Sequence, residues 1–198
     1  MVTEKLQAVL GASDITTVHE NAAYGFTLKL LSSKARKFNL LYTEGLSQKE
    51  QPVDEKNQQL KRLELYFLLP DYWDLSKKKW PVDWLNRIAQ VPQKNKTWFG
   101  TGDTLPAGNP PEYVDPQLKC SYFILSEPIL LGHELRGDQW HDANFSMLAV
   151  IPIFKREFDY KSQNSSKALL QIFKEKGVTE MIDTYRDPVA RKRFMGLF

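Results

Sequence analysis

The sequence of 198 residues has a single cysteine, Cys120, and no long apolar segment. One cysteine excludes an intrachain disulfide and a zinc site made of cysteines. The longest apolar runs, 65–69 and 147–154, are far shorter than the roughly 18 residues that a membrane-spanning helix needs. Because the N-terminus also lacks the apolar stretch of a signal peptide, we expect a cytoplasmic protein with no membrane contact.

A strong excess of charge of either sign is missing too. Lysine and arginine total 27, aspartate and glutamate 24, so the net charge is +3. This value is too small to indicate nucleic-acid binding by itself. The shares of hydrophobic residues, 42%, and charged residues, 26%, are those of an ordinary globular protein. The length suits one domain, and we expect residues 1–198 to form it.

Apolar residues recur with the period of two that is typical of β-strands. In the third predicted strand, Leu65 and Phe67 face one side while Tyr66 and Leu68 face the other, so this strand should be central and buried on both faces. The predicted strands are 24–31, 38–43, 63–69, 118–125 and 145–151.

Helical periodicity is strongest after the last predicted strand. Because most strands come first and most helices later, we predict an α+β fold, a mostly antiparallel or mixed β-sheet covered by helices on one side. The predicted helices are a short one within 1–12, one over 80–90 that Pro92 should end, and one from Ser165 or Ser166 to a left-handed Gly177.

Two histidine–acid pairs have side chains suited to metal binding or to acid–base catalysis. They are His133 with Glu134 and His141 with Asp142. The histidines are eight positions apart, not the four that place two histidines on one helix turn of a zinc hydrolase. Gly137 between them favours a polar surface loop. A small metal-dependent enzyme that uses these four residues remains the alternative function.

Other motifs that suggest chemistry are incomplete. The segment 100–104 resembles a phosphate loop, but the Walker lysine is missing and Pro106 follows instead of a helix, so we predict a turn. Cys120 lies within an apolar alternation and should be an inert, buried thiol. We therefore predict no enzyme activity, no catalytic residue, no metal and no cofactor.

Aromatic residues are concentrated in the middle of the chain. Eight of the 24 fall within residues 66–99. They could pack in the core, or act as anchors at an interface with a partner, where tryptophan is enriched. Trp73 and Trp98 lie in predicted loops, which leaves both interpretations open.

The C-terminal segment is basic and apolar, with Arg191, Lys192 and Arg193 followed by Phe194 and Phe198. Such a cluster can contact nucleic acid, anionic lipid or an acidic partner. A solvated terminal helix that docks by its apolar end is the simpler interpretation, and nucleic acid is not the favoured partner.

An ordered series of short motifs resembles the suppressor of fused domain family, and its later part resembles the bacterial branch of that family. The resemblance extends over residues 38–188 and consists of several pieces in a fixed order. These are ELYFLLP (64–70) with Trp73, WPVDWL (80–85), NKTWFG (95–100) before GDT (102–104), IPIFKRE (151–157), and ALL (168–170) before GV (177–178) and ID (182–183).

The resemblance implies an α+β domain with no known catalysis and no agreed catalytic residues. Animal members hold a zinc-finger transcription factor in an inactive complex and capture an extended peptide between two lobes, and this chain is too short for the second lobe. Bacterial members are proposed immunity proteins that neutralise toxins of polymorphic secretion systems. The hypothesis is therefore an immunity-type protein that blocks another protein, such as a toxin domain encoded nearby, by occlusion.

Two modes of binding follow from this hypothesis. A few buried anchors can supply most of the affinity of an interface, and we select the loop aromatics Tyr72, Trp73, Trp98 and Phe99 for this role. Addition of an extended partner strand to an exposed sheet edge is the other mode.

Overall fold

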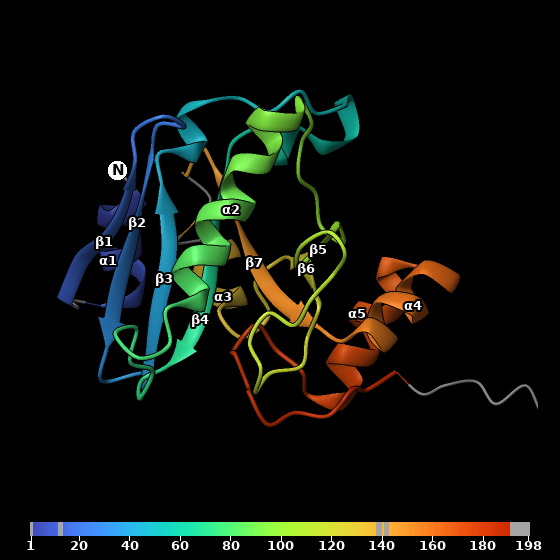
Figure 1. Cartoon of the computed structure of the whole chain (residues 1–198). Coiled ribbons are helices and arrows are strands. Elements are labelled where there is room, and N and C mark those ends of the chain that lie inside the picture. The colour runs from blue at the N-terminus through green and yellow to red at the C-terminus, as the bar shows by residue number, and fades with distance from the viewer. Residues whose placement is uncertain (1, 12–13, 138–139, 141–142, 191–198) are drawn as a thin grey trace, which may run out of the picture.

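The computed structural model describes residues 2–11, 14–137, 140 and 143–190, which form one seven-stranded sheet with helices packed on it (Figure 1). The strand order is β1-β2-β3-β4-β7-β6-β5, and every pair is antiparallel except β4 with β7. The fold is therefore α+β with a mixed, mostly antiparallel sheet, as predicted. The strands are β1 (Asp14–Asn21), β2 (Phe26–Ser33), β3 (Phe38–Glu44), β4 (Leu63–Pro70), β5 (Thr104–Pro106), β6 (Tyr122–Ser126) and β7 (Ser146–Ile153).

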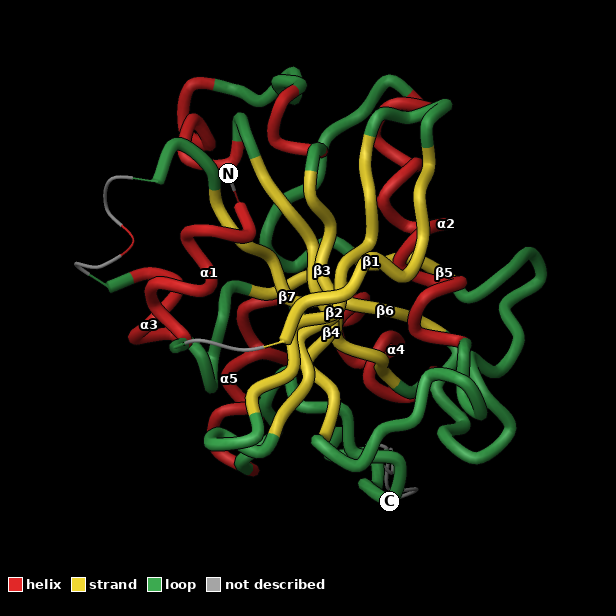
Figure 2. Tube along the Cα trace, turned by 90° about the vertical axis from the view of Figure 1, so that its left-hand side faces the viewer, coloured by secondary structure: helices red, strands yellow, loops and turns green. Residues whose placement is uncertain are grey.

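Helices cover both faces of the sheet, not one face as predicted (Figure 2). Helix α2 packs on one face, and α1, α3 and α5 pack on the other. None of the helices in the described part of the chain has the length and apolar character to cross a membrane. The helices are α1 (Val2–Leu10), α2 (Trp80–Asn95), α3 (Gly132–Arg136), α4 (Lys155–Gln163) and α5 (Ser166–Lys176), with 3-10 turns η1 (Leu46–Gln48) and η2 (Glu55–Leu60).

Strand β4 is central and buried on both faces, as predicted. Leu65 and Phe67 belong to the core cluster under α2, while Tyr66 and Leu68 belong to the cluster on the opposite face. Because side chains alternate along a strand, this one segment supplies both cores. Helix α5 packs on the cluster that lies opposite α2, and its Phe173 is fully buried there.

The ends of α5 are formed as the sequence predicts. The Ser165 hydroxyl oxygen accepts a hydrogen bond from the backbone N–H of Ala168 at 3.0 Å. Gly177 is left-handed, with φ of 68°, and the Val178 N–H donates to the Phe173 carbonyl at 2.8 Å. These bonds satisfy backbone groups that a helix leaves unpaired at its ends.

Pro92 does not end its helix as predicted, and β7 continues past residue 151, the predicted end of that strand. Helix α2 continues past Pro92 to Asn95. Proline cannot donate one backbone hydrogen bond of the helix, but Pro92 lies in the last turn, so the rest of the helix is unaffected. Strand β7 includes Pro152, which lies beyond Ala149, the last β7 residue paired with β4. A missing N–H on that side therefore removes no hydrogen bond of the β4–β7 ladder.

Strands β1 and β5 and helices α3 and α4 were not predicted from the sequence. Strand β1 lies at a sheet edge, is mostly polar and carries a bulge between Thr17 and His19 that interrupts its alternation. Helix α4 is mostly polar, and Glu157 is its one buried residue. Helix α3 replaces part of a predicted loop. Sequence periodicity is weak wherever little of an element is buried.

Candidate partner-binding surfaces

The four loop aromatics selected from the sequence differ widely in exposure. Tyr72 is 73% exposed, Trp98 is partly buried, and Trp73 and Phe99 are in the core. Tyr72 and Trp73 precede α2 whereas Trp98 and Phe99 follow it, and this helix of 16 residues is about 24 Å long. The two pairs therefore lie beyond opposite ends of α2, and the structure does not bring them together.

Trp73 is held firmly behind the exposed Tyr72. Its ring meets Trp80 edge to face, with ring centroids 5.7 Å apart. Its indole N–H donates to the Lys78 carbonyl at 3.1 Å, and the Lys78 ammonium lies 5.5 Å from its ring centroid. Asn39 donates to the Pro70 carbonyl at 3.3 Å. The loop that carries Tyr72 is therefore tied to the core.

A groove of about 510 Å³ lies beside Tyr72. We call it the Tyr72 groove. It runs between the end of β2 with the following turn and the loop between β4 and α2, segments that are some forty positions apart in the sequence. Its lining residues are Leu30, Ser32, Ser33, Lys34, Phe38, Asn39 and the continuous segment 71–76.

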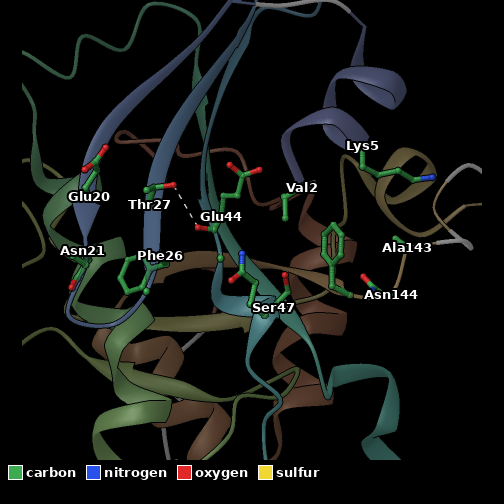
Figure 3. A pocket seen from close by; sticks show the side chains of 15 residues that line it. Val2, Lys5, Glu20, Asn21, Phe26, Thr27, Glu44, Ser47, Ala143 and Asn144 are labelled. Atoms are coloured by element: carbon green, nitrogen blue, oxygen red, sulfur yellow. Dashed lines mark hydrogen bonds between the residues drawn. The ribbon is translucent and has the colours of Figure 1, made fainter.

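A larger groove, of about 790 Å³, opens at the other end of the sheet (Figure 3). Val2 and Lys5 of α1 form one wall, while Glu20, Asn21 and Phe26 form the other. We call it the α1 groove. It has a mixed polar and apolar lining that also includes Ala22, Gly25, Thr27, Glu44, Gly45, Ser47, Gln48, Ala143, Asn144 and Phe145.

A buried carboxylate holds the turn that lines the α1 groove. Glu64 accepts hydrogen bonds from the Thr43 hydroxyl at 2.5 Å, the Gly45 N–H at 3.0 Å, and the Ser47 N–H and hydroxyl at 3.0 and 2.7 Å. Gly45 has φ of 119°, and a Cβ there would lie 2.6 Å from the Gly25 carbonyl oxygen. Although these donors favour the ionised form, burial raises the pKa of the Glu64 carboxyl.

The raised pKa of Glu64 predicts a dependence of stability on pH. The folded protein keeps the proton above the ordinary glutamate pKa of about 4.3, where the unfolded chain releases it. This contribution to stability is complete below that value and is lost as pH rises through the folded pKa. Glu64→Gln does not ionise, so we expect its stability to increase relative to the wild type as pH rises. Urea unfolding between about pH 4 and about pH 8 measures this difference.

The control for this prediction is Glu55→Gln, which replaces an exposed carboxyl in η2. Its stability should follow the wild type across the same pH range. If Glu64→Gln also stayed parallel to the wild type, the proposed shift in the pKa of Glu64 would be wrong.

Two of the four residues of the metal hypothesis, His133 and Glu134, lie in the described part of the chain. His133 is exposed on α3, and the Glu134 carboxylate pairs with the Arg36 guanidinium at 2.5 Å. His141 and Asp142 lie outside the described residues. Within the described residues, no group of three or more histidine, cysteine, aspartate or glutamate side chains is placed to hold a metal ion.

Helix α3 forms where the sequence favoured a loop, because a distant acid organises the preceding turn. The buried Glu180 carboxylate accepts hydrogen bonds from the backbone N–H groups of Ile129, Leu130 and Leu131 at 3.1, 2.8 and 3.0 Å. It also accepts one from the Tyr66 hydroxyl at 3.2 Å. Glu180 is about fifty positions further along the chain, so local sequence could not reveal this contact.

The remaining motifs are structural. Segment 100–104 is a turn that leads into β5, with the Asp103 carboxylate accepting the Gly100 N–H at 2.8 Å. Cys120 is fully buried, and burial raises the pKa of its thiol to about 12. The predicted turn and the predicted burial of Cys120 are confirmed. The basic cluster 191–193 lies outside the described residues.

Sequence reasoning selected Tyr72, which is exposed, but did not indicate either groove. Each groove is lined by segments that are distant in the sequence, so no local motif marks it. The one sequence signal for the Tyr72 groove was an aromatic residue, Tyr72, in the loop that follows Pro70 at the end of β4. Together, the mixed sheet and the helices on both faces define an α+β domain, and the α1 groove and the Tyr72 groove lie toward opposite ends of the sheet.

The profile of the suppressor of fused protein family matches residues 26–187. The chain therefore belongs to the suppressor of fused family, as the sequence motifs indicated. No curated protein matches the sequence.

Two solved structures share the fold. A suppressor of fused homologue from Neisseria gonorrhoeae FA 1090 is similar with a TM-score of 0.68 and 17% identity, over 96% of this chain and 96% of that chain. The crystal structure of a Sufu–Fu complex contains a chain with a TM-score of 0.61 and 12% identity, over 95% of this chain and 90% of that chain. At these identities the similarity establishes the fold.

Proposed function

We propose that this protein binds another protein and neutralises it by occlusion, as a cytoplasmic immunity-type protein would block a toxin domain encoded nearby. Membership of the suppressor of fused family is the observation that carries the proposal. A structural neighbour of this chain belongs to a Sufu–Fu complex, which supports a role in protein recognition. Occlusion needs no catalytic group, because a bound face excludes the partner's own substrate.

Tyr72 is the anchor that we assign to the partner-binding surface. It is exposed, yet its loop is fixed by the buried Trp73, so little conformational freedom is lost when a partner covers it. A tyrosine offers a large apolar ring and a hydroxyl that can donate or accept a hydrogen bond. Trp98 supplies a second, half-buried ring at the other end of α2, while Trp73 and Phe99 support the two loops from the core.

The first test is co-expression with toxin domains encoded beside this gene. We expect one of them to be tolerated only when this protein is present, and to be recovered with it as a complex. If no neighbour is neutralised and none forms a complex, the proposed function is wrong.

Tyr72→Ala should weaken the complex without unfolding the protein. Truncation of a binding hot spot costs about 2 kcal/mol or more, which corresponds to an affinity about thirty-fold lower. The free energy of unfolding should change by less than about 0.5 kcal/mol, because the side chain is exposed. Calorimetric titration of the recovered partner measures the affinity.

Tyr185→Ala is the matched control, since Tyr185 is 90% exposed and lies in the segment after α5. Its affinity should equal that of the wild type. An equal loss in both variants would contradict a specific role for Tyr72.

A further inference from the structure

We propose that the Tyr72 groove receives an acidic segment of the partner protein, an inference that rests on the proposed function and adds the chemistry of the ligand. The observation behind it is the charge of the two segments that extend its walls. One wall continues into the turn between β2 and β3, and the other into the loop before α2. Six basic residues follow these walls, namely Lys34, Arg36, Lys37, Lys77, Lys78 and Lys79, against the acidic Asp71 and Asp74.

Three of the six cations are already engaged. Arg36 pairs with the Glu134 carboxylate at 2.5 Å, and the Lys77 ammonium lies 3.4 Å from the Asp74 carboxylate. The third, Lys78, donates to the Gln117 side-chain oxygen at 2.7 Å and lies over the Trp73 ring.

The other three cations are available to a ligand. Lys34, Lys37 and Lys79 are exposed, and their ammonium groups have no hydrogen bond or ion pair with any described residue. Lys34 lines the groove, and Lys37 belongs to the same turn. Lys79 lies three positions after Ser76, which lines the other wall. A ligand that carries negative charge would gain attraction from both sides.

The acidic residues of the groove only partly reduce its attraction for a negatively charged ligand. The Asp74 carboxylate is occupied by the Ser76 N–H at 2.9 Å and the Ser76 hydroxyl at 2.6 Å, in addition to Lys77. Asp71 is exposed and is the one acid of the groove lining without such partners among the described residues. Within segments 34–37 and 71–79, the charged side chains without such partners among the described residues are therefore three lysines and one aspartate.

An acidic peptide fits this surface better than nucleic acid does. Tight, salt-dependent binding to nucleic acid uses about six to ten phosphate contacts, whereas three free lysines are present here. A groove of about 510 Å³ can hold a few side chains. Glutamate and aspartate side chains in an extended segment can reach the lysines while the backbone passes over the Tyr72 ring.

The test uses the full chain labelled with ¹⁵N and an eight-residue polyglutamate peptide as the probe. We expect amide shift changes at residues 34–37 and 71–79, and binding that strengthens as ionic strength is lowered. Shift changes that spare both segments, or no binding at low ionic strength, would overturn the inference. Tighter binding of an eight-nucleotide oligo-dT at the same residues would also overturn it, because the surface would then be a nucleic-acid site.

A charge-reversal variant sharpens the test. Lys34→Glu with Lys79→Glu should weaken peptide binding by about tenfold or more. The second substitution places an acid at the N-terminus of α2, where it is favourable to the helix, so the variant should stay folded. Lys56→Glu with Lys167→Glu makes the same change in net charge far from the groove. The inference is wrong if this control weakens binding equally.

The partner recovered by co-expression separates the inference from the proposed function. If the partner is neutralised equally by the wild type and by the Lys34→Glu, Lys79→Glu variant, the acidic-segment inference fails and the proposed function stands. If no partner is found, the proposed function fails, while the peptide titration still decides what the groove binds.

Discussion

Trp73→Ala is expected to lower the free energy of unfolding by about 3–5 kcal/mol, the range for truncation of a buried aromatic side chain. The indole is 7% exposed and packs edge to face on Trp80, so its removal leaves a cavity at the start of α2. The hydrogen bond from its N–H to the Lys78 carbonyl is lost as well. Urea unfolding monitored by circular dichroism measures the change.

Tyr72→Ala, one position earlier, is the natural comparison because it should leave the free energy of unfolding nearly unchanged. Trp73→Phe should lose less stability than Trp73→Ala, since a ring remains against Trp80. If Trp73→Ala kept full stability but lost the partner, Trp73 would be an interface anchor and not a core residue.

Arg186→Met is expected to destabilise the protein by about 3–5 kcal/mol, because it leaves a buried carboxylate without its cation. The Arg186 guanidinium donates two hydrogen bonds to Glu157, at 2.6 and 2.8 Å, and one to the Pro152 carbonyl at 3.0 Å. It is also stacked near Phe154 and Phe173, 4.8 and 5.5 Å from the ring centroids. Chemical denaturation at neutral pH measures the loss.

The double variant Arg186→Met, Glu157→Gln tests the origin of this loss. Removing the charge of Glu157 as well should restore part of the stability, because no unpaired ion then remains in the core. Lys155→Met breaks the exposed pair with Asp159 at 2.8 Å and should leave the unfolding midpoint nearly unchanged. A loss in Arg186→Met no larger than in this control would contradict a structural role for the buried pair.

Local sequence was sufficient where an element is buried on a regular period or ends with a specific residue. The alternation along β4 predicted both of its faces, and Ser165 and Gly177 predicted the ends of α5. In each case the information lies within a few residues, because hydrogen bonds at helix ends and side-chain alternation in strands are local.

Elements that depend on distant contacts could not be predicted this way. Helix α3 is organised by Glu180, about fifty positions away, and α4 begins where Glu157 accepts the N–H of Phe154 and pairs with Arg186. The presence of helices on both faces of the sheet also escaped prediction, because amphipathic helices carry no mark of the face on which they pack.

For the candidate site, too, the sequence predicted some features and only the tertiary structure revealed the others. The sequence was enough to establish the family resemblance, the α+β class and a cluster of aromatics around α2. Which of these aromatics is available to a partner depended on packing alone: Trp73 turns inward onto Trp80, while the adjacent Tyr72 points to solvent. The Tyr72 groove and its lysines arise only when the β2–β3 turn meets the loop before α2, because tertiary contacts join segments whose separation in the chain hides their proximity.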